Sequence, residues 1–277
     1  MSDLWVTLSS GFATEEHDTI AWWAGKPTYL LLHGFLGTPA EWRPIATVLH
    51  RAGCSVVAPL LPGFGRRLGE LPTVTLERWV SELQQVTRTV ASLQPLVIVG
   101  FSLGGALAIQ VAAMTEPAGL VLLAPFSRLP LPRVQQWFFP ILDRLSSGPR
   151  PFARVNFDDP ALQHALTGWN PLLDVRNPVI RQQLQSLRIP WRLLHQLART
   201  AKAARHACKQ VRCPVIIVHG RSDTTVPLRD SQVLARCFPT LSRFYETEGD
   251  HQLVRSEHPS FSLVCDVLLD MRRVSPL

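Results

Sequence analysis

The stretch of residues 96–113 reads LVIVGFSLGGALAIQVAA and combines an apolar run, a glycine-rich turn and a helical pattern. Its first part, Leu96-Val97-Ile98-Val99, is a short apolar run typical of a strand that is buried on both faces. Its last part, from Ala106 to Ala113, predicts a helix. Between them, Gly100-Phe101-Ser102-Leu103-Gly104 matches the pattern Gly-x-Ser-x-Gly at a strand–turn–helix junction. The pattern predicts a sharp turn that lifts the Ser102 hydroxyl clear of the sheet.

The residues around Ser102 suit a nucleophile. Gly100 and Gly104 leave room for the strand and the helix to approach closely. The start of the helix places a positive dipole end near any anion that develops there. We therefore predict that Ser102 is a catalytic nucleophile rather than part of a plain glycine-rich turn.

A nucleophilic serine needs a base and an acid that orients the base. Asp223 follows the apolar run 215–219, at the sheet edge where open α/β sheets bind ligands. We predict that it is the acid; the alternative is a turn aspartate that caps the next helix. His251 follows a later strand and is the predicted base. Glu248 and Asp250 are rival acids, and His219 is set aside as a base because it lies inside a strand.

Short apolar runs alternate with helical patterns along the chain, which predicts an α/β fold with a mostly parallel sheet flanked by helices. The predicted strands are residues 4–8, 19–23, 29–33, 55–59, 96–100, 120–124, 215–219 and 243–246. The first two are expected to form an antiparallel edge hairpin. The predicted helices are residues 40–51, 76–93, 103–115, 191–209, 228–237 and 259–272.

One long segment interrupts this rhythm. About 90 residues separate the predicted strands at 120–124 and 215–219, far more than a crossover connection needs. The segment is rich in Pro, Arg and bulky apolar residues. We predict a core formed by residues 1–126 and 189–277, with residues 127–188 inserted as a helical cap, or lid.

Composition limits the function classes. The chain has 277 residues, 46% of them hydrophobic, and no apolar run reaches the roughly 18 residues of a membrane-spanning helix. The net charge is +7, and residues 126–210 hold 13 basic residues against four Asp and no Glu. A solvated basic surface explains this excess; the alternatives are an anionic substrate, an acidic partner or peripheral contact with anionic lipid. No nucleic-acid-binding motif accompanies the charge, so nucleic acid is not an expected partner. The oligomeric state is left open.

The five cysteines are widely spread and include no Cys-x-x-Cys pair. The N-terminus, Met1-Ser2-Asp3-Leu4, lacks the basic and apolar regions of a secretory signal. Both features predict reduced thiols in a cytoplasmic protein, and a zinc site is not expected.

The chain resembles the α/β-hydrolase family over nearly its whole length. The order Ser102, Asp223, His251 is the family's order of nucleophile, acid and base. His33-Gly34-Phe35-Leu36-Gly37 resembles its oxyanion-loop motif. Residues 58–65, APLLPGFG, resemble its Pro-Gly-His-Gly loop, with Phe64 in place of the usual His. The stretch 33–79 is most similar to bacterial carboxylesterases and monoacylglycerol lipases.

The resemblance implies a serine hydrolase of carboxylic esters, small-acyl or monoacylglycerol-like, that works through an acyl-enzyme. The backbone N–H groups of Phe35 and Leu103 would bind the oxyanion. No metal or organic cofactor is needed, and His33 is expected to be structural. The bulky side chains that could line an acyl pocket, or equally serve as packing, are Phe35, Phe64, Phe101, Trp137, Phe138 and Phe139.

Two alternatives stay open. One is a carbon–carbon lyase or hydrolase of the menaquinone-pathway synthase type, which uses the same triad. That synthase often carries Arg directly after the Gly-Gly pair, where this chain has Ala106. The other is a catalytically silent α/β-hydrolase that acts as a binding module, against which the complete set of three triad residues argues.

Overall fold

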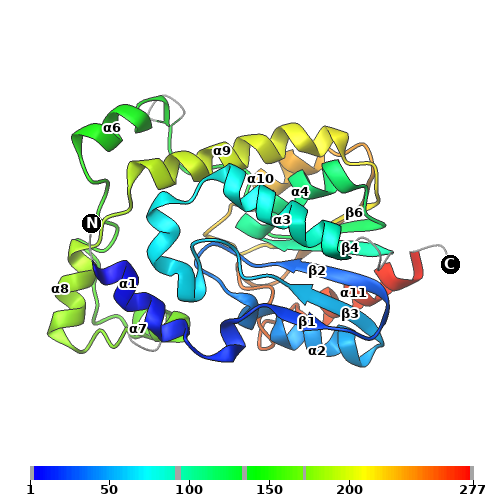
Figure 1. Ribbon diagram of the computed structural model, residues 1–277, viewed down its shortest axis with the longest axis horizontal. Coiled ribbons are helices and arrows are strands. Elements are labelled where there is room, and N and C mark those ends of the chain that lie inside the picture. The colour runs from blue at the N-terminus through cyan, green and yellow to red at the C-terminus, as the bar shows by residue number, and fades with distance from the viewer. Residues whose placement is uncertain (1–2, 91–94, 133–135, 171–172, 275–277) are drawn as a thin grey trace.

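The computed structural model describes residues 3–90, 95–132, 136–170 and 173–274. Its centre is a seven-stranded sheet with the order β1-β3-β2-β4-β5-β6-β7 (Figure 1). The edge strand β1 pairs antiparallel with β3, and all the other pairs are parallel. The strands are β1 Ile20–Trp22, β2 Gly25–Leu32, β3 Cys54–Ala58, β4 Leu96–Phe101, β5 Gly119–Leu123, β6 Val215–Gly220 and β7 Leu241–Thr247.

Helices cover both faces of this sheet (Figure 1). Helices α2 and α11 pack on one face, and α3, α4, α9 and α10 pack on the other. Among the described residues, no helix combines the length and the apolar character needed to cross a membrane. The helices that cover the sheet are α2 Arg43–Arg51, α3 Leu76–Val90, α4 Leu103–Thr115, α9 Trp191–Ala207, α10 Leu228–Ala235 and α11 Phe261–Val274. The described 3-10 helices are η1 Ser10–Phe12, η2 Glu15–His17, η3 Pro39–Trp42, η4 Gly65–Thr73 and η6 Cys208–Gln210.

The central strands send side chains alternately into two apolar cores. In β4, Leu96 and Ile98 join the core beneath α3 and α4, while Val97 and Val99 join the core beneath α2 and α11. All six β4 residues are buried, which explains why the strand shows no alternation of polar and apolar residues. The predicted mostly parallel α/β sheet is confirmed.

Most of the predicted elements are present with small shifts at their ends. The helix predicted at 103–115 has those bounds, whereas the one predicted at 40–51 divides into η3 and α2. Pro44 stands in the first turn of α2, where its missing N–H is tolerated, so the α-helix begins only at Arg43. The end of the helix predicted at 76–93 lies partly outside the described residues.

The strand predicted at residues 4–8 is wrong, and so is the edge hairpin built on it. Residues Asp3–Ser9 form helix α1, which packs against η4. Trp5, Leu8 and Phe12 are buried, and their spacing of three and four residues is the helical period. The edge strand β1 pairs with β3 instead.

The helices of residues 127–188 whose bounds lie in the described part are α6 Phe139–Leu145, α7 Pro160–Trp169 and α8 Pro178–Ser186. Figure 1 shows α6, α7 and α8 at the same end of the molecule as α1. The segment is tied to the N-terminal region because the Asn170 side-chain amide donates to the Leu8 carbonyl at 2.8 Å. Residues 133–135 and 171–172 of this segment lie outside the described part.

The turn between β4 and α4 leaves no room for a side chain at Gly104. A Cβ atom there would lie 2.1 Å from the Leu32 carbonyl oxygen, and one at Gly100 would lie 2.5 Å from the Gly104 carbonyl oxygen. Both obstacles are backbone atoms, which cannot move without displacing β2 or α4. These two glycines are therefore required by the close approach of strand and helix.

We predict that Gly104→Ala lowers the free energy of unfolding by more than about 3 kcal/mol, because overpacking against backbone is not relieved by a side-chain rotation. Gly53→Ala is the matched control. Gly53 has φ +84°, but a Cβ atom added there would meet no atom within 4 Å, so only the backbone conformation opposes the change, at about 1 kcal/mol. Urea unfolding measures both values, and equal losses would contradict the close-approach argument.

Candidate active site

Ser102 occupies a strained turn at the carboxyl end of β4. Its φ of 50° and ψ of −114° lie outside the regions that residues with a Cβ atom ordinarily adopt. Backbone hydrogen bonds fix the turn: the Ser102 N–H donates to the Leu123 carbonyl at 2.9 Å, and the Ser102 carbonyl accepts from Gly105 and Phe126. Strain of this kind costs about 1 to 3 kcal/mol and clusters at functional sites.

His251 and Asp223 form a buried hydrogen-bonded pair. His251 Nδ1 lies 2.6 Å from Asp223 Oδ2, and each residue is only 8% exposed. They come from loops after the neighbouring parallel strands β7 and β6, which explains how residues 28 positions apart meet. Because a carboxylate accepts, Nδ1 is the donor, and Nε2 is left for another partner.

The imidazole of His251 lies beside the Ser102 turn. The ring of Phe101, the residue before Ser102, packs on it with a centroid separation of 4.9 Å. Within the described chain the Ser102 hydroxyl makes no hydrogen bond, so the structure contains the Asp–His pair without a closed link to the serine. Catalytic hydrogen bonds of this kind are often formed only in the substrate complex.

A second histidine also binds Asp223, although its place inside a strand argued against a role in the site. His219 is fully buried, with Nε2 3.2 Å from Asp223 Oδ2 and 2.9 Å from the Val226 carbonyl. The carbonyl requires Nε2 to carry the proton, so Nδ1 accepts from the Ser231 hydroxyl at 2.8 Å. The sequence signal that could have identified His219 is a polar residue inside an otherwise apolar strand, four positions before Asp223.

These bonds determine the charge of Asp223. Burial alone would raise its pKa, but hydrogen bonds from His219 and His251 outweigh burial and hold the pKa well below the usual range. The other oxygen accepts from the backbone N–H groups of Thr225 and Val226, both at 2.8 Å. Asp223 is therefore an anion at neutral pH.

The rival acids lie elsewhere. The Asp250 side chain is 63% exposed, and its carboxylate accepts from the Gln252 N–H. Glu248 is exposed as well. Of the three carboxylates considered, Asp223 alone has a recorded contact with His251 within the described chain.

The loop after β2 passes directly in front of the serine turn. A Cβ atom on Gly34 would lie 3.6 Å from the Ser102 Cβ. Among the described residues, no acceptor is recorded for the N–H group of Phe35 or that of Leu103. Two free donors therefore lie on the two segments that border Ser102.

Buried His33 supports this loop from inside. Its Nε2 accepts from the Leu61 N–H at 3.1 Å, while Nδ1 lies 2.9 Å from the Gly34 carbonyl. The carbonyl must accept, so His33 is the neutral tautomer protonated on Nδ1. Burial lowers the pKa of His33 to about 4, so it stays uncharged at neutral pH.

Two further residues hold the loop, and neither was predicted from the sequence. The Gly34 N–H donates to Glu41 Oε1 at 2.8 Å, and burial of that carboxyl group raises its pKa to about 8. The indole N–H of Trp169 donates to the Leu36 carbonyl at 2.5 Å, across 133 residues of sequence. Leu36 has a φ of +59°, so the insert anchors a strained point of the loop. No local sequence signal announces a contact between segments so far apart.

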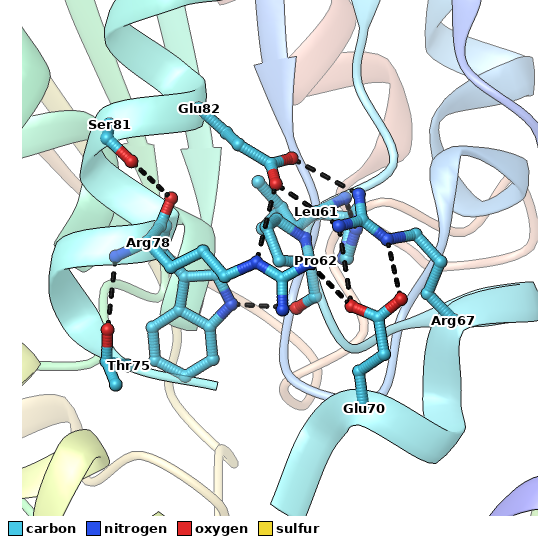
Figure 2. A network of polar contacts seen from close by, with 10 residues as sticks. Leu61, Pro62, Arg67, Glu70, Thr75, Arg78, Ser81 and Glu82 are labelled. Atoms are coloured by element: carbon cyan, nitrogen blue, oxygen red, sulfur yellow. Dashed lines mark hydrogen bonds and ion pairs between the residues drawn. The ribbon is translucent and has the colours of Figure 1, made fainter. Parts of the chain in front are cut away.

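Four ion pairs form a ring on the outer side of the loop that follows β3 (Figure 2). The residues of this ring are Arg67, Glu70, Arg78 and Glu82. The ring joins η4 to α3. Beneath it, the Trp79 indole donates to the Pro62 carbonyl at 2.9 Å, next to the Leu61 N–H that binds His33. Partly exposed ion pairs each contribute up to about 1 kcal/mol, so the ring adds modestly to a position already fixed by buried bonds.

The aromatic residues predicted for an acyl pocket divide into two groups. Phe101 and partly buried Phe35 border the site, and Phe64 is fully buried between His33, Phe35 and Trp79. Phe64 therefore fills the core beneath the loop, and a lining role for it stays a prediction.

The second group lies in the insert. Trp137 is 84% exposed and Phe138 is 49% exposed. Phe139 is fully buried and stacks on Trp191 of α9 at 5.6 Å. Among the described residues, no hydrogen bond or ring contact joins any of the three to Ser102, Asp223 or His251, and their place in an acyl pocket stays a prediction.

The fold and these residues define a class of protein. Residues 29–261 match the model of the alpha/beta hydrolase family, and the chain belongs to that family. It is 25% identical over 220 residues to a thermostable monoacylglycerol lipase of Bacillus sp. (strain H-257), covering 76% of each chain. It is 34% identical over 101 residues to 2-succinyl-6-hydroxy-2,4-cyclohexadiene-1-carboxylate synthase of Salmonella paratyphi C (strain RKS4594), which is 35% of this chain and 38% of the synthase.

Solved structures share the fold. One, from work on the metagenome-derived lipolytic enzymes LipS and LipT, superposes with a TM-score of 0.71 at 18% identity, covering 94% of this chain and 98% of its own. The monoacylglycerol lipase of Paleococcus ferrophilus gives 0.68 at 17% identity, with 93% and 98% covered. The predicted α/β-hydrolase fold is confirmed.

The buried His33 predicts a pH effect on stability. Between pH 6.5 and about 4 the unfolded chain takes up a proton at this residue that the folded protein does not, so stability falls as the pH drops through that window. The expected loss at this site is about 3 kcal/mol, at 1.36 kcal/mol per unit of pKa. Nitrogen-15 NMR should show His33 neutral and protonated on Nδ1 at pH 5.5. A His33 that titrates near pH 6.5 would contradict the assigned bonds.

Proposed function

We propose that the protein is a serine hydrolase that cleaves carboxylic esters through an acyl-enzyme intermediate. The observation that carries the proposal is the buried His251–Asp223 pair, 2.6 Å apart, beside the strained turn of Ser102. The order of these three residues along the chain, and their places after β4, β6 and β7, suit a triad of nucleophile, acid and base.

The same catalytic groups act in both halves of the proposed reaction, acylation of the serine and deacylation by water. His251 Nε2 takes the Ser102 proton as Oγ attacks the ester carbonyl, and Asp223 stabilises the resulting imidazolium. The N–H groups of Phe35 and Leu103 bind the oxyanion of the tetrahedral intermediate. His251 then protonates the leaving alcohol, and water removes the acyl group by the same route. Loss of one oxyanion donor typically costs roughly 100- to 1000-fold in turnover.

The substrate class we propose is a small-acyl or monoacylglycerol-like ester. The similarity to the Bacillus monoacylglycerol lipase, which covers three quarters of both chains, supports it. We also propose that residues 127–188 act as a cap on the core formed by 1–126 and 189–277, because Trp169 of this segment binds the loop that carries Phe35. The five free cysteines support a cytoplasmic location.

A second candidate function is the carbon–carbon bond chemistry named for the synthase relatives. The 34% identity over 101 residues favours it, and Ala106, where that synthase often carries Arg, counts against it. A panel of p-nitrophenyl esters graded by chain length separates the two. Turnover of short esters supports the hydrolase; inertness to every ester, with Ser102 still labelled by a fluorophosphonate, supports the second candidate.

Ser102 should be the only serine that a fluorophosphonate labels, because the reagent requires a hydroxyl activated by a nearby base. We expect Ser102→Ala to lose all labelling and more than 1000-fold of the esterase activity while it unfolds at the same urea concentration as the native chain. Mass spectrometry of the labelled peptide locates the adduct. Labelling that persists in Ser102→Ala would refute the assignment.

Asp223→Asn should lower kcat by about 10⁴-fold, because the neutral amide no longer holds the His251 tautomer that accepts the serine proton. Asp250→Asn is the matched control and should change kcat less than threefold, since the Asp250 side chain is largely exposed. Steady-state kinetics on p-nitrophenyl acetate measure both. A reversed order of the two effects would make Asp250 the orienting acid.

A further inference from the structure

The outer face of α6 is an apolar surface that the described chain does not cover. Four side chains on or beside this helix are strongly exposed: Trp137 at 84%, Phe138 at 49%, Ile141 at 53% and Leu145 at 76%. They provide four of the nine large exposed apolar side chains found among the described residues. Counted at 100° per residue from the N-cap Phe138, Ile141 and Leu145 fall within one third of the helix circumference, and Trp137 directly precedes Phe138. We call these four residues the α6 stripe.

The α6 stripe cannot turn inward, because the opposite face of the helix is already bound to α9. Phe139 stacks on Trp191, and the Trp191 indole donates to the Ser146 hydroxyl at 2.8 Å. The Asp143 carboxylate accepts from the Arg192 backbone N–H at 3.1 Å. The helix therefore presents two apolar faces, one packed and one open to solvent.

The exposed arginines of α6 and of the segment directly after it have no acidic partner. Arg144 lies on the helix, and Arg150 and Arg154 follow it in the chain; all three are exposed, and none pairs with a carboxylate among the described residues. The acid of this helix, Asp143, lies on the inner face. An apolar stripe with unpaired arginines on and directly after its helix is complementary to a surface that combines acyl chains with anionic headgroups.

We propose that the α6 stripe, together with Arg144, Arg150 and Arg154, docks the protein on an anionic lipid bilayer. The apolar side chains enter the boundary between headgroups and acyl chains, and the guanidinium groups bind the phosphates. Figure 1 shows α6 projecting beyond the N-terminal end of α9, at the end of the molecule that also holds α1 and α8. Docking does not require ester hydrolysis, so it is tested without it.

Vesicle flotation of the full chain carrying Ser102→Ala tests the proposal. We expect partitioning onto vesicles of phosphatidylcholine with 30% phosphatidylglycerol to exceed partitioning onto pure phosphatidylcholine at least tenfold, and to fall with added salt. Trp137→Ser/Ile141→Ser/Leu145→Ser should reduce partitioning at least tenfold. The matched control, Trp23→Ser/Met114→Ser/Val233→Ser, removes exposed apolar side chains from other elements and should change it less than twofold.

A second variant tests the contribution of the arginines separately from that of the apolar side chains. Arg144→Gln/Arg150→Gln/Arg154→Gln should lose the preference for anionic vesicles while its thermal unfolding stays unchanged. Absence of vesicle binding, or equal losses in the stripe and control variants, would overturn the proposal. So would a stable dimer in light scattering that the stripe variant dissociates, because a second copy would then cover the stripe. Every protein in these vesicle tests also carries Ser102→Ala, so none of them can hydrolyse an ester by the proposed route. Failure of the esterase proposal therefore leaves these outcomes unaffected.

Discussion

The positive-φ backbone at Ser102 is the constraint on which the rest of the site depends. It brings α4 so close to β4 and β2 that a Cβ atom added at Gly100 would lie 2.5 Å from the Gly104 carbonyl oxygen, and one added at Gly104 would lie 2.1 Å from the Leu32 carbonyl oxygen. The same close packing brings the loop after β2 against the serine. A Cβ atom added at Gly34 of this loop would lie 3.6 Å from the Ser102 Cβ. The neighbouring parallel strands β6 and β7 then carry Asp223 and His251 to the same edge of the sheet. The geometry of one turn therefore decides which residues can meet.

Around that turn, buried polar groups act as fixed supports. Asp223 is held by two backbone N–H groups and two histidines, which keeps it an anion despite burial. Burial keeps His33 neutral, and two bonds of opposite polarity fix its tautomer. Because the Asp223 carboxylate and the His33 imidazole are fully bonded, their loops are held in one arrangement, and the proposed reaction needs little reorganisation when charge develops.

Much of this was predictable from the sequence, because local patterns determined it. Alternating apolar runs predicted the sheet, and the Gly-x-Ser-x-Gly pattern between a strand and a helix predicted the serine turn. The strand predicted at residues 4–8 failed because a five-residue apolar run suits either element, and only contact with η4 makes it the helix α1. His219 was set aside because its position in a strand hid a side chain that reaches Asp223. Glu41 and Trp169 were missed because their contacts join segments that are distant in sequence or depend on a strained loop.

A crystal structure of the protein phosphonylated by an ester analogue would show whether the turn of Ser102 organises the site. The phosphonyl group mimics the tetrahedral intermediate, so its oxygen occupies the place of the oxyanion. We expect an adduct on Ser102 Oγ, with that oxygen about 2.7 to 3.1 Å from the N–H groups of Phe35 and Leu103, and with His251 Nε2 facing Oγ. An adduct on another residue, or an oxygen that points away from both N–H groups, would contradict this expectation.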